Sequence, residues 1–318
     1  MSLRVHGDAL VGDGLLDFAV NVWPGERPPE LEQALRRALA DRRYPDQRRA
    51  RAAVAARHDR EVDEVLLLNG AAEGLWLIAQ TLRPARAAVV HPSFTESELA
   101  LRAAGADVVR VFRDPRDWSL DPGSVPRDAE LVVVGNPNNP TGTVDPPLAA
   151  PGLVVVDGSF ADFVPFDPEG DVVIRSLTKL WSLAGVRAGY LLGPRELVER
   201  LESNRQPWSV NAIACAAIEL AAGDRATPAR VAREVRAARE RLIAGLAALG
   251  VRVWPSAVNF LLLELDDAAR VAAALRARGI AVRPCDSFPG LDDGRHLRVA
   301  VRTEDDNDRL VELMAEVV

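Results

Sequence analysis

The chain has 318 residues, 48% of them hydrophobic and 27% charged, a composition that excludes a disordered chain or a small disulfide scaffold. Its formal net charge of -7 argues against a positively charged surface that binds nucleic acid. No secretion signal opens the chain, and its apolar runs stay well short of the roughly 18 residues that span a membrane, so we expect a cytosolic protein. Cys215 and Cys285 lack the spacing of a zinc site or a disulfide framework, so we expect neither.

Short apolar runs alternate with helical patterns over the first two thirds of the chain. Runs of this kind are typical of strands buried on both faces of a sheet, with helical crossovers between them. Helices are predicted over Ala71–Leu82 and Glu96–Ala104, which places the chain in the α/β class. The predicted strands are Val65–Leu68, Ala87–Val90, Val108–Phe112, Leu131–Val134, Leu153–Val156 and Val172–Ile174.

The sequence pattern changes after about residue 205, where we predict long helices rich in alanine, arginine and leucine, notably Arg230–Leu249. We predict a large domain over residues 40–224, and a smaller α+β domain made of residues 1–39 and 225–318. Proline-rich stretches at Arg27–Glu30 and Val144–Pro151 are predicted to be loops. The other predicted elements of the smaller domain are strands at Val251–Trp254, Phe260–Leu265, Ile280–Arg283 and Leu297–Val301, and helices at Ala268–Arg278 and from Glu304.

One residue stands out in the composition: all but one of the 39 basic residues are arginine, and the exception is Lys179. Arginine cannot lose its proton near neutral pH, whereas a lysine amine can form an imine with an aldehyde. Ser176, Thr178 and Arg187 surround this lysine in the sequence and suit a phosphate group. Pyridoxal 5'-phosphate carries both an aldehyde and a phosphate. The alternative is a surface lysine without a chemical role.

Three further segments follow predicted strands. Asn136–Gly142 places amide side chains after Leu131–Val134, where ligands of α/β proteins bind, although a plain turn is the alternative. Asp157 ends a buried strand, and a carboxylate there needs a partner such as a protonated pyridine nitrogen. Asn69–Gly74 joins a strand to a helix whose N-terminus suits a phosphate, which is a weak signal because such junctions are common.

Taken in order, these motifs resemble the fold type I pyridoxal-phosphate enzymes, the aspartate aminotransferase superfamily, over essentially the whole chain. The resemblance implies a large domain with a mostly parallel seven-stranded sheet in αβα layers, plus a smaller α+β domain. The motifs are Asn-Gly-Ala-Ala-Glu from Asn69, Pro-x-Phe ending at Phe94, Asn-Asn-Pro-Thr-Gly from Asn138, Asp-x-x-Phe from Asp157, Ser-x-x-Lys from Ser176 and Arg-x-Gly-Tyr from Arg187.

The resemblance also implies roles for individual residues. Lys179 would form the Schiff base, Asp157 would pair with the pyridine nitrogen, and Asn139 would donate to the ring oxygen. Phe94 would stack on the ring. The phosphate would lie among Ser176, Thr178, Arg187 and the backbone of Ala71 and Ala72, and Tyr44 would reach it from the other subunit of a homodimer. Arg298 would hold the substrate carboxylate in a bidentate fork.

Within the superfamily, the chain resembles the threonine-phosphate decarboxylases of cobalamin biosynthesis more than the histidinol-phosphate aminotransferases. We therefore expect decarboxylation of L-threonine O-3-phosphate to (R)-1-amino-2-propanol phosphate, with transamination to 2-oxoglutarate as the alternative. The resemblance places His6 and Asn21 on the substrate side, although His6 also fits an exposed terminal histidine. The segments that favour the decarboxylases are His6-Gly7, Asp17–Pro24, Gln206–Asn211 and Arg283–Leu291.

Several positions depart from the family pattern, among them Gly158 and Ser159, which stand where Glu-Ala is usual. Phe160 stands where many aminotransferases carry a tyrosine that bonds the ring oxygen, so we expect a higher pKa for the Schiff base. Asp8 stands where a second glycine often follows His-Gly, which leaves the pocket for a substrate phosphate undefined. Among other classes, a regulator that binds the cofactor without catalysis is a further alternative. A nicotinamide oxidoreductase is disfavoured, because no G-x-G-x-x-G follows the first strand.

Overall fold

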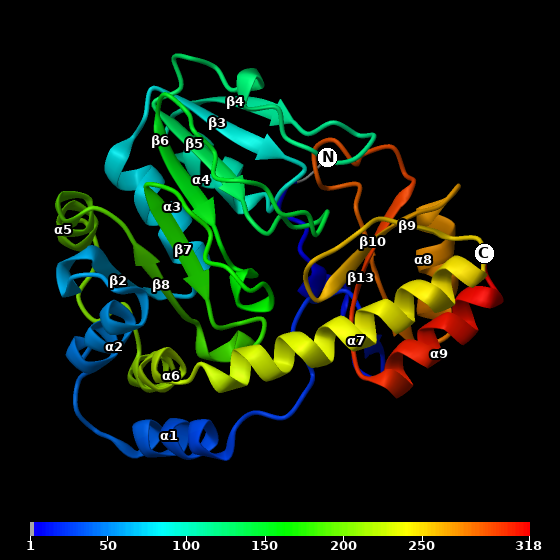
Figure 1. The fold of residues 1–318 in the computed structure, drawn as a ribbon, viewed down its shortest axis with the longest axis horizontal. Helices are drawn as coiled ribbons and strands as arrows, with labels where there is room; N and C mark the ends of the chain where they lie inside the picture. Colours follow the sequence, from blue (N-terminus) through cyan, green and yellow to red (C-terminus); the bar gives the residue numbers. More distant parts are fainter. Residues whose placement is uncertain (1–2) are drawn as a thin grey trace.

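The computed structural model describes residues 3–318, which form two units joined by the long helix α7 (Ala226–Ala248) (Figure 1). A seven-stranded sheet organises the larger unit, and all its neighbouring strands run parallel except β8, which is antiparallel to β2 and β7. In spatial order its strands are β2 (Val65–Asn69), β8 (Ala188–Leu192), β7 (Val172–Ser176), β6 (Leu153–Asp157), β5 (Leu131–Gly135), β3 (Arg86–His91) and β4 (Asp107–Phe112).

Both faces of this sheet are buried because successive side chains of a strand point to opposite faces. Leu66 and Leu68 of β2 pack in one hydrophobic cluster, while Val65 and Leu67 pack in another. The first cluster contains side chains of α3 (Ala71–Leu82), α4 (Glu96–Ala103) and α5 (Arg195–Ser203). The second contains α2 (Arg48–His58) and α6 (Ala212–Gly223). This burial explains why the strands are nearly continuous apolar runs.

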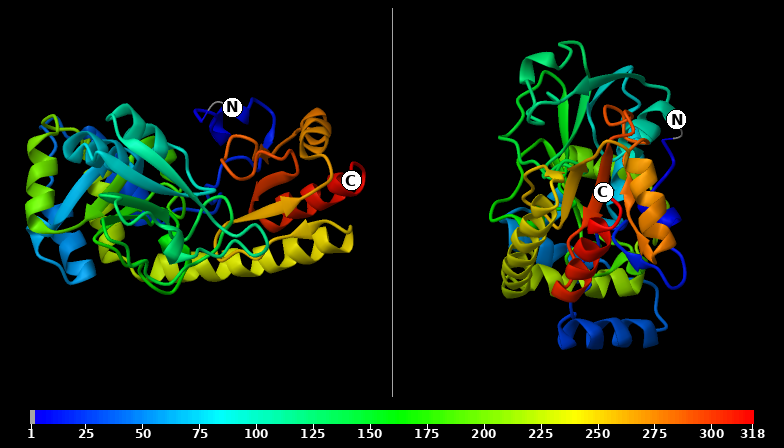
Figure 2. Two further views of the ribbon diagram at one scale, coloured as in Figure 1. Left: turned by 90° about the horizontal axis from the view of Figure 1, so that it is seen from above. Right: turned by 90° about the vertical axis from the view of Figure 1, so that its right-hand side faces the viewer.

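The smaller unit is built on a four-stranded antiparallel sheet, and Figure 2 shows it beside the larger unit with α7 spanning both. A two-residue strand near the N-terminus, β1 (Leu16–Asp17), pairs with β11 (Ile280–Ala281). In spatial order the sheet is β12 (Arg283–Pro284), β13 (His296–Ala300), β10 (Phe260–Glu264) and β9 (Arg252–Val253), accompanied by helices α8 (Ala268–Ala277) and α9 (Glu304–Ala315).

The structure corrects several predicted boundaries. The predicted loop Arg27–Glu30 is wrong at its end, because helix α1 (Pro29–Ala40) begins at Pro29, whose fixed φ suits a first helical turn. Helix α7 begins at Ala226, earlier than predicted. The predicted strand Ile280–Arg283 is divided into β11 and β12, and β8 is an additional strand. The domain boundaries stay a prediction, and α1 itself packs on α6 of the larger unit.

Two other observations concern the whole described chain. Within residues 3–318, none of the helices combines the length and the apolar character that crossing a membrane requires. Cys215 and Cys285 are both buried free thiols.

Candidate active site

A cavity of about 370 Å³ lies where the larger unit, the N-terminal segment and the smaller unit meet. The carboxyl ends of β6 and β7 lie side by side there, since Asp157 pairs with Ile174 in the sheet register. Residues predicted from distant parts of the sequence come together in its lining: His6, Asn21, Phe94, Asn139, Thr178, Lys179, Arg187 and Arg298. Asp157 lines a small adjoining pocket that shares Phe94, Asn139 and Phe160 with the cavity.

Lys179 follows β7 and is half-buried at the cavity wall. Burial, and secondly the positive charge of Arg298, lower the pKa of the Lys179 amine to about 8. About a tenth of this amine is therefore uncharged at pH 7, far more than of an ordinary lysine, and formation of an imine requires this neutral form.

Two hydrogen bonds from one neighbouring residue, Ser159, hold the Asp157 carboxylate at the end of β6. Its Oδ1 accepts hydrogen bonds from the backbone N–H of Ser159 at 3.1 Å and from the Ser159 hydroxyl at 2.5 Å. Burial raises the pKa of the Asp157 carboxyl above its usual value, while these hydrogen bonds and Lys179 act in the opposite direction. A cationic N–H at this carboxylate would stabilise its ionised form.

Gly70, at the N-terminus of α3, lies against Arg187, which lines the cavity. Gly70 has φ +79° at the N-terminus of α3, and a Cβ there would overlap Nη2 of Arg187 and lie 2.9 Å from its Cζ. Only glycine leaves room for the guanidinium in this position. Ala71 and Ala72 open α3, where backbone N–H groups favour an anion. A Cβ added at Gly189 would lie 3.0 Å from the Ala71 nitrogen, so the strand β8 closely approaches this helix end.

Ser176 and Thr178 connect that helix end to the lysine. Ser176 is paired with Gly189 in the sheet, and its Oγ accepts a hydrogen bond from the Thr178 N–H at 3.2 Å. Thr178 lines the cavity directly, whereas Ser176 does not. The predicted phosphate residues thus cluster around the ends of β2, β7 and β8.

Two buried arginines face each other in the smaller unit. Arg298 on β13 donates to Oδ1 of Asn139 and to the carbonyl of Ala19, both at 2.6 Å. Burial lowers the pKa of Arg298 to about 10. Arg283 lies directly opposite on β12 and lines the same cavity, donating to the carbonyl of Val5 at 2.6 Å. The two guanidinium groups make this wall suited to anionic groups.

Arg283 lies in a segment that favours the decarboxylases, but the sequence predicted no role for its side chain. The signal that would have found it is the pairing of β12 with β13, because residues directly opposite each other on antiparallel strands point to the same face.

The N-terminal segment contributes Asn21 and His6. Asn21 is 3% exposed, and within residues 3–318 neither atom of its amide has a hydrogen-bond partner. A buried amide of this kind is expected to bond a ligand. The His6 Nε2 lies 2.8 Å from Oε1 of Glu96, and its ring is 5.5 Å from that of Phe94. His6 is therefore anchored at the cavity, although its role remains a prediction.

Four predicted residues line neither the cavity nor its adjoining pocket: Ser176, Ala71 and Ala72, which lie near the cavity at the ends of β7 and α3, and Tyr44, which is exposed. The Tyr44 side chain is 76% exposed and stacks on Trp208, itself 59% exposed, with ring centroids 4.7 Å apart. A role for Tyr44 in the site of a second subunit stays a prediction.

The residues fit a cofactor with an aldehyde, a protonatable ring and a phosphate. Lys179 would hold the aldehyde, Asp157 the ring nitrogen, and Arg187 with the first turn of α3 the phosphate. Gly70 lets the Arg187 guanidinium lie beside the N-terminus of α3, and the buried, unpartnered amide of Asn21 favours a bound ligand in the cavity.

Comparison with known proteins decides the family. Residues 13–314 match the sequence model described as aminotransferase class I and II. The chain belongs to this family. Pyridoxal 5'-phosphate is therefore its cofactor, and the chain is a pyridoxal-phosphate-dependent enzyme.

Relatives of this chain within the family include proteins named histidinol-phosphate aminotransferase and proteins named threonine-phosphate decarboxylase. A histidinol-phosphate aminotransferase of Mycobacterium tuberculosis is 46% identical over 95% of this chain and 87% of its own length. A threonine-phosphate decarboxylase of Salmonella typhimurium is 31% identical over 96% and 92%. The structure of a histidinol-phosphate aminotransferase from Clostridium acetobutylicum superposes with a TM-score of 0.88 at 24% identity, covering 95% of this chain and 99% of that one. That likeness confirms the predicted fold.

Proposed function

We propose that the chain is an aminotransferase of the histidinol-phosphate type, which passes the amino group of a phosphorylated substrate to 2-oxoglutarate. This reverses the order of the two functions expected from the sequence. The relative with 46% identity has the aminotransferase name, whereas the relative named as a decarboxylase is 31% identical. The structural observation that carries the proposal is the pair of buried arginines, Arg283 and Arg298, on one cavity wall.

An aminotransferase must bind two different substrates in one cavity. Glutamate and 2-oxoglutarate carry two carboxylates each, and two arginines provide one guanidinium fork for each carboxylate. A phosphorylated amine would place its phosphate on the same wall when the dicarboxylate has left. The hydrogen-bond partners of this buried pair are carbonyl, amide and hydroxyl oxygens, and within residues 3–318 neither arginine forms an ion pair, so an anionic substrate would stabilise both charges.

The remaining residues would move and stabilise charge. Bound pyridoxal 5'-phosphate supplies an aldehyde for the substrate amine and a ring that withdraws electrons from its Cα. The freed amine of Lys179, with a pKa of about 8 before the cofactor binds, would take the Cα proton and return it elsewhere. Asp157 would keep the ring nitrogen protonated. Arg298 would hold a substrate carboxylate close to Asn139.

A decarboxylase acting on L-threonine O-3-phosphate is the second candidate. It is favoured by the 31% identical relative and by His6 and Asn21, which the resemblance assigns to the substrate side and which line the cavity. A phosphate held near Arg283 would orient the substrate for loss of its carboxylate rather than of its Cα proton. Carbon dioxide would then leave, and a proton would replace it at Cα.

One pair of assays separates the candidates. Holoenzyme is incubated with histidinol phosphate and 2-oxoglutarate, and glutamate is measured; in parallel it is incubated with O-phospho-L-threonine without an acceptor, and carbon dioxide is measured. The proposal predicts glutamate that depends on both substrates and no carbon dioxide. Carbon dioxide without an acceptor, and no glutamate, would replace it with the decarboxylase. Lys179→Ala should abolish either product.

We also propose a homodimer in which Tyr44 completes the phosphate site of its partner. The exposed stack of Tyr44 on Trp208 supports this, because large aromatic side chains are enriched at interfaces. Subunit mixing tests it. Inactive Lys179→Ala and weakened Tyr44→Ala proteins should together regain activity, since one site of each mixed dimer would have both residues intact. If mixing restores nothing while mixed dimers form, Tyr44 does not act across the interface.

A further inference from the structure

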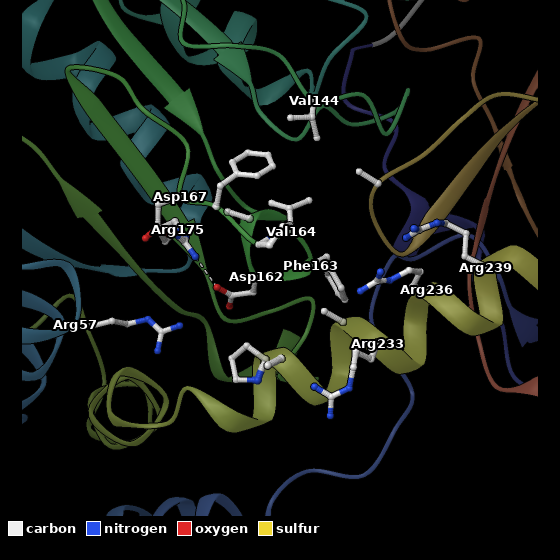
Figure 3. Close-up of a pocket in the computed structure, with 17 residues that line it drawn as sticks. Arg57, Val144, Asp162, Phe163, Val164, Asp167, Arg175, Arg233, Arg236 and Arg239 are labelled. Carbon is white, nitrogen blue, oxygen red and sulfur yellow. Dashed lines mark hydrogen bonds and ion pairs between the residues drawn. The ribbon is translucent and has the colours of Figure 1, made fainter.

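A second groove, of about 680 Å³, lies between α7 and residues 161–167 (Figure 3). It is distinct from the cavity described above, but the two share a wall. Phe160 lines the cavity, and the next residue, Ala161, lines the groove. Helix α7 packs on the short turn at Ala161–Phe163 of the larger unit and on α9 of the smaller unit, so the groove lies at the joint of the two units.

The two walls of the groove differ in character. Arg233, Arg236 and Arg239 of α7 follow each other at intervals of three residues and line one wall. The facing wall is apolar and includes Phe163, Val164 and the half-exposed Phe166. In Figure 3 the guanidinium group of Arg236 points from α7 toward Phe163.

The charges of the groove are not balanced. Five arginines and two aspartates line it, although the chain as a whole has a net charge of -7. Both aspartates, Asp162 and Asp167, pair with the buried Arg175, at 2.5 Å in the case of Asp162.

Within residues 3–318, the other four arginines of the groove form no ion pair with a carboxylate. Arg57 donates to backbone carbonyls at the end of α6, including that of Asp224 at 3.2 Å, and Arg239 donates to the carbonyl of Val258 at 2.9 Å. Arg233 and Arg236 are exposed and have neither a hydrogen bond nor an ion pair to any residue from 3 to 318. Their donors are free to bind a ligand.

We propose that this groove binds an amphipathic organic anion. A phosphate or carboxylate group would lie on Arg233 and Arg236, and an apolar ring or chain would lie on Phe163 and Val164. Like charges three residues apart on a helix repel one another, and an anion would relieve this repulsion. Guanidinium forks bind such groups in a bidentate manner, and the groove's volume lies within the usual range of small-molecule sites.

Holoenzyme can be tested with 8-anilinonaphthalene-1-sulfonate, whose sulfonate and fused rings reproduce this chemistry. We expect saturable fluorescence enhancement, and much weaker binding of the uncharged N-phenyl-1-naphthylamine. The double variant Arg233→Gln/Arg236→Gln should raise the Kd of the sulfonate at least about tenfold. The control Arg230→Gln/Arg309→Gln removes two exposed arginines that pair with Glu234 and Glu312 away from the groove, and it should bind as the unaltered enzyme does.

Four outcomes would overturn the proposal. Equal affinity of the two double variants would show that the arginines do not hold the anion. Equal binding of the uncharged analogue would indicate an apolar site without charge recognition. A lower oligomeric state of Arg233→Gln/Arg236→Gln by analytical ultracentrifugation would assign the groove to contacts between copies. An Arg298→Gln variant checks the location, since loss of sulfonate binding there would place the probe in the catalytic cavity.

Discussion

Replacing Gly70 with alanine tests how the site holds the cofactor phosphate. The backbone at Gly70 has φ +79° and ψ 155°, a region that is nearly exclusive to glycine and costs other residues about 1–3 kcal/mol. The new Cβ would also meet the guanidinium of Arg187. Because that group ends a flexible side chain, it should swing away and the backbone should stay in place. A lost charged hydrogen bond is worth about 1.5–3 kcal/mol, which raises the Kd of pyridoxal 5'-phosphate about 10- to 150-fold.

Gly105→Ala is the matched control. Gly105 also has a positive φ, +92°, but a Cβ there meets nothing within 4 Å and lies away from the cavity. Both variants should lower the free energy of unfolding, by about 1–2 kcal/mol in the control. Only Gly70→Ala should weaken cofactor binding in a titration followed by visible absorbance. If the two variants bind the cofactor equally well, the inferred contact between Arg187 and the phosphate is wrong.

Three further predictions concern charge in the cavity. In the cofactor-free protein, the rate at which Lys179 forms its imine with pyridoxal 5'-phosphate should rise with pH around a midpoint of about 8, since only the neutral amine reacts. Arg298→Gln removes a charge that lowers this pKa, so the midpoint should move upward in stopped-flow absorbance; an unmoved midpoint contradicts the electrostatic account. Arg283→Lys keeps the charge but loses the fork, and should raise the KM for the phosphorylated substrate about 10-fold or more while leaving the spectrum of the bound cofactor unchanged. Phe160→Tyr should shift the absorbance titration of the holoenzyme to lower pH, because the hydroxyl would add a hydrogen bond to the ring oxygen; identical titrations would exclude that role.

The strands of the larger unit were predictable because both faces of its sheet are buried. The run Leu131–Val134, for example, is continuously apolar and forms most of β5. Strand β8 escaped prediction as a strand because it starts with Ala188 and Gly189, which have low strand propensity, and is specified by its pairing with β2 and β7. Helix α1 was not predicted, and its first two residues were assigned to a loop, because proline signals both loops and first helical turns.

The site was predictable where its residues follow strands in the sequence. Asp157 and Lys179 both come after buried strands whose carboxyl ends meet at one edge of the sheet. Arg283 could not be given a role, because its position opposite Arg298 depends on the register of two strands from different segments. The contact of His6 with Glu96 joins residues 90 apart, and no local pattern encodes it.

The most direct test of the central claim is to locate the bond between the protein and its cofactor. Holoenzyme reduced with borohydride and digested for mass spectrometry should carry a pyridoxyl group on Lys179, and the Lys179→Arg variant should carry none. Because Lys179 is the only lysine in the chain, the α-amino group is the one other amine that competes. Pyridoxyl incorporation that is absent, or that persists unchanged in Lys179→Arg, would contradict the assignment of this cavity as the active site.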